Sequence, residues 1–215
     1  MRISIESSYD REAVAPRETR TVDSHGKAFT IPKNYMALQP MDDDPEGSDV
    51  FGFGGKEADA VAFFTVVPDD DALPFGDTGT VVDGIHGVLG ENQGLVRVGT
   101  GKSLLNGVPY IYSIVRTEVD SRHTQYVLTF QFSFGSKALN IEAHFDETGE
   151  QSRRTAAVWS IGQDRKRPWV EDPYSPGYTG GSPMTQAEEP RWDASYPDSA
   201  IALCRTLVRC LAENN

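Results

Sequence analysis

Residues 96–115 read VRVGTGKSLLNGVPYIYSIV, two apolar stretches on either side of an Asn-Gly dipeptide. Asn106-Gly107 favours a hairpin because both central residues of a type I′ turn need a positive φ. A two-residue turn at this point would lay Tyr112 over Gly101, an aromatic side chain covering a glycine. The stretch therefore predicts a β-hairpin, and we interpret its Asn-Gly pair as turn chemistry and not as a binding site.

The alternation of apolar and polar residues continues from Leu95 to Phe145 and predicts a four-stranded antiparallel meander. We expect the second connection, DSRH at residues 120–123, to pair Val119 with Thr124, and the third to turn at residues 135–136. These pairings place one apolar set on a single face, which we predict to be the main core: Val98, Ile111, Val115, Leu128, Phe130, Phe132, Leu139, Ile141 and Ala143. A slip of one residue would turn such a set toward water.

Three further segments have the spacing of helices. The predicted helices run from a cap at Asp77 or Thr78 to Gly90 or Gly94, over residues 147–161, and from about Ser199 onward. Short strands are predicted at residues 1–5, from residue 27 to Pro32, at residues 50–55 and at residues 60–68. The fold class that follows is α+β, with an antiparallel sheet sandwiched between helices.

Before the last helix the composition changes. Residues 168–197 hold six of the thirteen prolines, and such a segment cannot be regular helix or interior strand. Its aromatic side chains argue against a free linker, and they provide candidate interface residues: Trp169, Tyr174, Tyr178 and Trp192. We predict a single domain over residues 1–215, with this excursion at about 164–198 laid over its body.

Composition narrows the class of function. A net charge of −12 repels phosphate backbones, so we expect no nucleic-acid partner. No apolar run approaches the ~20 residues of a membrane helix, and the first residues lack the core of a signal peptide, so we expect a cytoplasmic protein without membrane contact. Cys204 and Cys210 lie in one predicted helix as packing residues. No His, Cys or acidic spacing predicts a metal site, and we expect no cofactor.

The second face of the predicted meander is polar and aromatic, as in ligand or peptide surfaces. The expected pairings gather six candidate ligand-binding or partner-binding residues there: Tyr110, Tyr112, Arg116, Gln131, Glu142 and His144. Glu142 and His144 point the same way from one strand and could share a proton. The competing interpretation is that a helix or the excursion covers this face and satisfies its polar groups within the chain.

Two motifs, FTIPKNY at residues 29–35 and the 96–115 stretch, resemble the PsbP-like group of proteins. That group includes the photosystem-associated PsbP proteins, the yeast Ran-binding release factor and bacterial lipoproteins of the DcrB type. Tyr35 stands where the group often has tryptophan, and the excursion departs from its pattern. The resemblance implies an antiparallel sheet with helices on both faces and a binding or assembly role, and it carries over no catalytic residue.

The sequence leaves three functional hypotheses. The leading one is a non-enzymatic binding or assembly module that engages a protein partner, through the second face or through the aromatic excursion. The alternative is a small-ligand-binding protein or enzyme that uses Glu142 and His144 as an acid/base pair. The third is a homo-oligomer in which the excursion reaches across to another copy.

Overall fold

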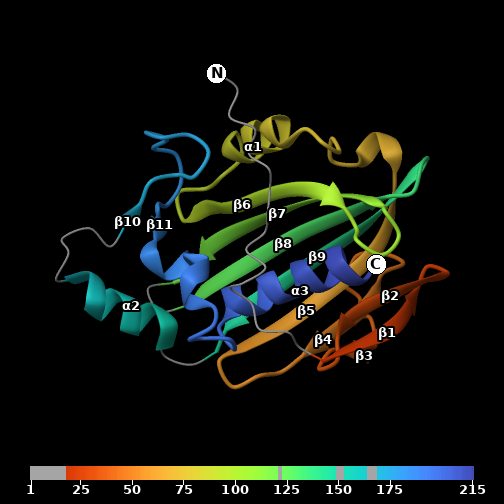
Figure 1. Cartoon of the computed structure of the whole chain (residues 1–215), viewed down its shortest axis with the longest axis horizontal. Helices are drawn as coiled ribbons and strands as arrows, with labels where there is room; N and C mark the ends of the chain where they lie inside the picture. Colours follow the sequence, from red (N-terminus) through yellow and green to blue (C-terminus); the bar gives the residue numbers. More distant parts are fainter. Residues whose placement is uncertain (1–17, 121–122, 149–152, 164–168) are drawn as a thin grey trace.

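A computed structural model of the chain describes residues 18–120, 123–148, 153–163 and 169–215. Its centre is a seven-stranded antiparallel sheet in the order β3-β4-β5-β9-β8-β7-β6 (Figure 1). The strands are β3 (Met36–Leu38), β4 (Asp49–Phe53), β5 (Ala58–Pro68), β6 (Gln93–Lys102), β7 (Pro109–Glu118), β8 (Thr124–Ser133) and β9 (Lys137–Glu147). The α+β class and the meander are therefore confirmed, whereas the strand predicted at residues 1–5 lies outside the described residues.

A separate two-stranded hairpin packs on the sheet. It consists of β1 (Thr19–Ser24) and β2 (Lys27–Pro32), with Ser24 paired to Lys27 across a two-residue turn. His25 and Gly26 both have positive φ, 49° and 73°, as a type I′ turn requires. The type I′ turn geometry that the sequence predicts at Asn106-Gly107 is therefore found in this hairpin, at His25-Gly26.

The first face of the sheet, which we call the core face, is covered by the β1–β2 hairpin and by α3 (Ala200–Asn214). Figure 1 shows α3 lying over the sheet, where it contacts β9, β8 and β5. Ser199 is the N-cap residue of α3, so the predicted start of the last helix is confirmed. The apolar side of α3 is buried against the sheet through Ile201, Leu203, Cys204, Leu207, Val208 and Leu211.

The second face is covered at its β6–β7 edge by α1 (Thr78–His86). Asp77 caps this helix as predicted, since its Oδ1 accepts a hydrogen bond from the Thr80 N–H at 3.1 Å. The helix ends at His86, with Gly87 as C-cap, earlier than the predicted glycines. Val98, Ile111 and Val115, which we predicted in the main core, pack with α1 in a second cluster.

The pairing of β7 with β8 differs from the prediction by one residue. Glu118 pairs with Thr124, and Ser113 pairs with Thr129. The connection closes with the Val119 N–H donating to the His123 carbonyl at 2.9 Å, so Val119 belongs to the turn and not to the strand. Because side chains alternate between faces, this single step moves every β7 side chain to the face opposite the predicted one.

The β6–β7 turn is longer than predicted. Lys102 pairs with Pro109, and the Ser103 N–H donates to the Val108 carbonyl at 2.8 Å. Gly107 has a φ of 66°, but the backbone of Asn106 is not in the positive region, so the dipeptide does not form a type I′ turn. The resulting two-residue shift places Tyr112 over Gly99, and Tyr110 over Gly101.

The second predicted helix also starts later than expected. Residue 147 ends β9, and α2 spans Arg153–Gln163. Residues 169–198, which we call the strap, contain β10 (Trp169–Val170), β11 (Met184–Thr185) and two short 3₁₀ helices, η2 (Gln186–Glu188) and η3 (Pro190–Trp192). The single-domain organisation stays a prediction. None of the described helices is long and apolar enough to span a membrane.

Candidate functional site

The six residues predicted to share one surface are divided between the two faces of the sheet. Tyr110, Tyr112 and Arg116 lie on the core face and are buried. Gln131, Glu142 and His144 lie on the opposite face, paired across β8 and β9 as predicted in the register of those two strands. The grouping of all six on one face is therefore wrong, because it depended on the predicted β7–β8 register.

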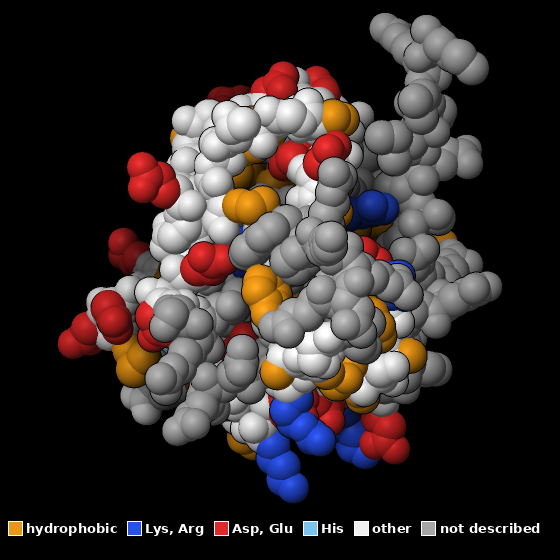
Figure 2. Space-filling model, turned by 90° about the vertical axis from the view of Figure 1, so that its left-hand side faces the viewer, with side chains coloured by type: hydrophobic (Ala, Val, Ile, Leu, Met, Phe, Trp, Pro, Cys, Tyr) orange, Lys and Arg blue, Asp and Glu red, His pale blue; other side chains and the backbone are white. Residues whose placement is uncertain are grey.

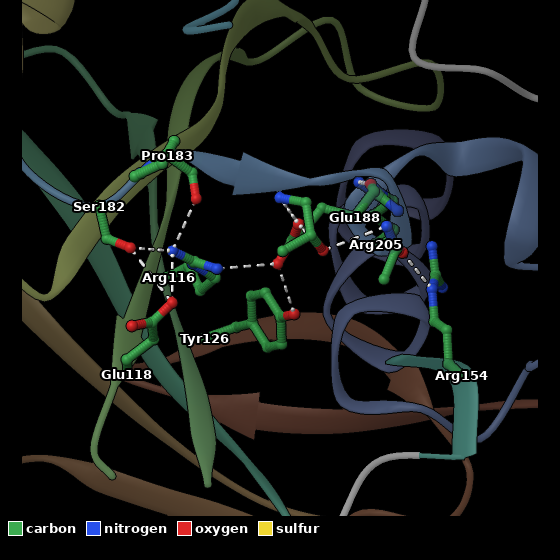
Figure 3. Close-up of polar contacts among 10 residues, drawn as sticks. Arg116, Glu118, Tyr126, Arg154, Ser182, Pro183, Glu188 and Arg205 are labelled. Atoms are coloured by element: carbon green, nitrogen blue, oxygen red, sulfur yellow. Dashed lines mark hydrogen bonds and ion pairs between the residues drawn. The ribbon is translucent and has the colours of Figure 1, made fainter. Parts of the chain in front are cut away.

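Arg116 joins the sheet to the strap (Figure 3). Its guanidinium donates to the Ser182 hydroxyl at 2.7 Å and to the Pro183 carbonyl at 3.0 Å. It also lies 3.1 Å from a Glu118 oxygen and 3.4 Å from a Glu188 oxygen. Arg116 is 2% exposed, and a buried cation of this kind needs such partners to offset its lost hydration. Arg116 is thus a structural anchor of the strap.

Glu188 accepts hydrogen bonds from both the sheet and the strap. Its Oε1 accepts from the Tyr126 hydroxyl at 3.4 Å, and its Oε2 accepts from the Thr185 hydroxyl at 2.7 Å. Burial raises the pKa of Tyr126 well above its ordinary value, and the negative charge of Glu188 adds to this effect. The Tyr126 hydroxyl is therefore held as a neutral donor under the strap.

A second buried cluster lies where α2 and α3 meet the strap. The Arg154 guanidinium contacts Asp193 Oδ1 at 2.6 Å and donates to the Glu189 carbonyl at 2.8 Å. It also donates to the carbonyl of Ala187. Arg205 of α3 reaches the same Asp193 oxygen at 2.9 Å. The pKa of Arg154 is lowered mainly by burial, and the neighbouring Asp193 opposes that shift.

Two of the predicted interface aromatics make contacts within the chain. The Tyr174 hydroxyl accepts from the Val98 N–H at 2.5 Å and donates to the Val98 carbonyl at 3.0 Å. Because β6 is an edge strand, this contact satisfies backbone groups that no neighbouring strand can reach. Tyr178 donates to the His86 carbonyl at 2.8 Å and stacks on the His86 ring at 4.1 Å.

The two predicted interface tryptophans differ from these tyrosines. Trp192 is half-buried in η3, and the Arg191 guanidinium lies 5.1 Å from its ring. Its indole N–H has no hydrogen-bond partner among the described residues. Trp169 begins β10, and its side chain lies outside what the structure describes. An interface role for either residue stays a prediction.

A cavity of about 190 Å³ opens between α3, the β6–β7 edge of the core face and the strap. Its floor is apolar and buried, and consists of Val96, Tyr112, Ile114 and Val208. Half-buried Arg97, Arg205 and Arg209 stand at its rim. Figure 2 shows the strap side of the molecule, with apolar side chains visible between scattered carboxylates and a few Lys and Arg side chains.

Tyr112 connects this cavity to the predicted site. Burial raises the pKa of its hydroxyl, while the charge of Arg97 and a hydrogen bond with Arg97 oppose the shift. Its ring lies over Gly99, where a Cβ would come within 2.5 Å of a ring carbon. Tyr112 is therefore fixed by a glycine below it and an arginine beside it, in the wall of a cavity that the sequence did not predict.

The other half of the predicted site lies on what we call the open sheet face. It consists of half-buried second-face side chains on β5, β8 and β9: Val61, Phe63, Thr65, Val127, Thr129, Asn140, Glu142 and His144. His144 Nε2 lies 2.9 Å from Glu142 Oε1, and the His144 ring meets Phe63 edge to face at 6.1 Å. The hydrogen bond with His144 lowers the pKa of the Glu142 carboxyl, and partial burial opposes this.

Gln131 lies at the end of this face and is buried. Its Oε1 accepts from the Leu73 N–H at 2.7 Å, and its Nε2 donates to Asn140 Oδ1 at 3.0 Å. Both functions of its amide are therefore satisfied within the chain. Gln131 positions the loop before α1, and its amide is not directed toward a ligand.

Sequence reasoning missed Arg154, Glu188 and Asp193, which hold the strap. One signal was present: Thr185 and Glu188 form a capping box at the start of η2, and a Thr followed three residues later by Glu is its signature. Arg154 and Asp193 carry no comparable local pattern, since their partners are distant in the sequence. Only the folded chain brings them within 2.6 Å.

Three solved structures are similar to this chain. The Ran-binding protein Mog1p of Saccharomyces cerevisiae matches with a TM-score of 0.46 and 10% identity, over 93% of this chain and 98% of that chain. The cyanobacterial PsbP protein CyanoP of Synechocystis matches with a TM-score of 0.40 and 18% identity, over 70% and 90%. PA94 of Pseudomonas aeruginosa, a protein of unknown function, matches with a TM-score of 0.36 and 12% identity, over 71% and 98%.

No protein-family model and no curated protein sequence matches the chain. A PsbP protein and a Ran-binding protein, two members of the group that the sequence resembles, are among these structures.

Proposed function

We propose that this chain is a non-enzymatic binding or assembly module that engages a protein partner through the open sheet face. The observation that carries the proposal is the exposure of this face. Phe63, Val61 and Val127 keep part of their surface exposed on it, whereas the core face is buried beneath α3 and the β1–β2 hairpin. Apolar side chains grouped within a polar rim are typical of protein interfaces.

The charge of this face indicates the chemistry of the partner. Besides Glu142, the carboxylates of Asp59 and Asp146 belong to the same side of β5 and β9. No lysine or arginine stands among the described residues that form the open sheet face, and the whole chain carries a net charge of −12. A partner with a basic surface would therefore be attracted over distance and held at the rim.

The face continues toward an edge of the sheet. Met36 and Leu38 of edge strand β3 are 58% and 43% exposed, and both lie on the second face by their pairing with β4. Exposed apolar side chains that adjoin a half-exposed sheet face extend the apolar area offered to a partner. A cytoplasmic setting agrees with this proposal, and it rests on sequence composition alone.

The enzyme alternative receives less support. Glu142 and His144 are close enough to share a proton, but their side chains are 44% and 27% exposed. Neither residue lines the cavity beside α3. Acid/base catalysis requires a substrate held in reach of the pair.

The experiment replaces Phe63 with a photo-crosslinking phenylalanine analogue, and replaces Leu105, which is 70% exposed in the β6–β7 turn, as a matched control. We expect position 63 to capture one protein in cells and position 105 to capture none of it. A Glu142→Lys change in the same chain should strongly reduce that capture. Equal capture from both positions, or capture unaffected by the reversed charge, would contradict the proposal.

A further inference from the structure

The cavity beside α3 has the size of a binding site for one small group. Its volume is about 190 Å³, and a closed apolar cavity of roughly 150 Å³ accepts a benzene ring. The four floor residues, Val96, Tyr112, Ile114 and Val208, are each at most 6% exposed. An aromatic ring or a branched aliphatic group placed on this floor would complete the packing of the main core.

The acidic side chains around the cavity are already neutralised. Three of them line it, and each is paired with an arginine outside the lining: Glu188 with Arg116 at 3.4 Å, Asp193 with Arg154 at 2.6 Å, and Glu189 with Arg191 at 2.7 Å. A carboxylate held in this way attracts an incoming cation only weakly. The acidic groups therefore do not select a cationic ligand.

The arginines that line the cavity differ from these carboxylates in the charges that surround them. Arg205 shares the single Asp193 oxygen with Arg154, so two guanidinium charges face one carboxylate. Arg97 contacts the neutral Tyr112 hydroxyl, and Arg209 lies 3.1 Å from Glu213. Each guanidinium has five N–H donors and stays charged at any relevant pH, and carboxylates are anions that such a planar group binds through charge-assisted hydrogen bonds. In a chain of net charge −12, this rim is a local site for an anion.

The cavity is preorganised. Its outer wall includes Met184, Thr185 and Pro190 of the strap, and the strap is fixed on either side by the buried contacts of Arg116 and Arg154. A wall that is already ordered loses little conformational entropy when a ligand binds. The apolar floor and the arginine rim are thus held at a set distance from each other.

From this arrangement we propose that the cavity binds a carboxylate joined through one or two carbon atoms to a ring-sized apolar group, with the apolar group on the floor and the carboxylate at the arginine rim. Two sources share this chemistry: a free aromatic or branched aliphatic acid, and the last residue of a peptide with a free C-terminus. The site lies on the core-face side and is independent of the proposed protein interface on the open sheet face.

The test is calorimetric titration of the full chain with phenylacetate and with its neutral analogue phenylacetamide. Phenylacetate should bind at least about tenfold more tightly, because the charge-assisted hydrogen bonds at the rim are lost with the amide. An Arg97→Gln change should reduce this preference. Equal binding of both probes, or no saturable binding of phenylacetate or of the peptide described below, would overturn the proposal.

Variants locate the site. Val208→Phe fills the floor and should abolish binding, whereas Val88→Phe, at a position 80% exposed in the turn after α1, should leave it unchanged. If Val208→Phe does not fold, Met184→Trp narrows the rim from the half-buried β11 and serves the same purpose. Undiminished binding by a folded cavity-filling variant would show that the probe binds elsewhere.

A second pair of probes distinguishes the sources. A hexapeptide that ends in phenylalanine is compared with the same peptide amidated at its C-terminus. Tighter binding of the free peptide than of phenylacetate assigns the cavity to a protein C-terminus, and weaker binding assigns it to a free acid. Binding of the amidated peptide as tightly as the free one would contradict both assignments.

Discussion

The two faces of the central sheet are built from the same strands, yet only one of them is fully covered. On the core face, Phe130, Ile141 and Phe145 are completely buried beneath α3 and the β1–β2 hairpin. On the opposite face, their neighbours Thr129 and Glu142 are half-exposed. The difference follows from where α1 lies, since this helix packs on β6, while the described part of the chain leaves the second face of β5, β9 and β8 partly exposed.

This comparison shows how one chain can separate stability from recognition. Buried apolar side chains on the core face supply the free energy of folding. The strap covers the β6–β7 side, where the buried side chains of Arg116 and Arg154 join it to the sheet and to α2. The open sheet face makes few such contacts, so its residues can change at small cost to stability. Each prediction below measures one side of this contrast.

The largest expected effect compares two phenylalanines on opposite faces. Phe130→Ala should lower the free energy of unfolding by about 3–5 kcal/mol, because Phe130 is fully buried and leaves a cavity. Phe63→Ala should cost less, about 1–2 kcal/mol, since its ring is only partly buried on the open sheet face. Urea denaturation of both variants measures the difference. Similar losses would mean that the two faces are equally buried.

The next effect concerns the strap and compares adjacent arginines of α2. Arg154→Ala should cost about 3–5 kcal/mol, because it leaves the carboxylate of Asp193 buried with one partner fewer. The side chain of Arg153 is 80% exposed beside Glu57. Arg153→Ala should therefore lower the free energy of unfolding by less than about 1 kcal/mol. Thermal unfolding and limited proteolysis within residues 169–198 report both changes. A stable, protease-resistant Arg154→Ala chain would refute the anchoring role.

A smaller effect is expected at the edge of the sheet. Tyr174→Phe removes the hydroxyl that bonds both backbone groups of Val98, and should cost about 1 kcal/mol. Amide hydrogen exchange at Val98 should become faster, while exchange in the middle of β8 should not change. Unchanged exchange at Val98 would show that the strap does not cap this edge.

The smallest effect is pH-dependent and belongs to the open sheet face. Because the hydrogen bond with His144 lowers the pKa of Glu142 below its usual 4.5, this carboxylate stabilises the fold above that pH, and the contribution disappears as the pH falls through the lowered value. Both side chains are partly solvated, so Glu142→Gln should cost less than about 0.5 kcal/mol at neutral pH, and this cost should disappear once the pH falls below the lowered pKa. A difference that grows on acidification would have the wrong sign.

Much of the fold could be predicted from the sequence where the signals were local. Asp77 caps α1, Ser199 precedes α3, and the tight turn after Phe132 gives the correct β8–β9 register. Each of these features depends on residues only a few positions apart. Turn chemistry, helix capping and alternation act over that range.

The candidate site depended on turn lengths, which the sequence did not determine. The turn between β7 and β8 holds one residue more than expected, and this alone moved Tyr112 and Arg116 under the strap. Alternation cannot detect such an error, because Ser113 and Tyr112 stand beside each other on a strand that is buried on both faces. The partners that cover β7 come from residues 182–193 and 205–209, beyond any local pattern.

The most direct measurement tests the β7–β8 register with paired cysteines. Cys204 and Cys210 are free and buried, and burial raises the pKa of Cys210 to about 12, so the native thiols should stay unreactive. Ser113→Cys combined with Thr129→Cys places two thiols directly opposite each other, within reach of a disulfide. We predict that mild oxidation cross-links this pair and not Ser113→Cys with Phe130→Cys. Cross-linking of the second pair instead would restore the predicted register and contradict the division of the site between two faces.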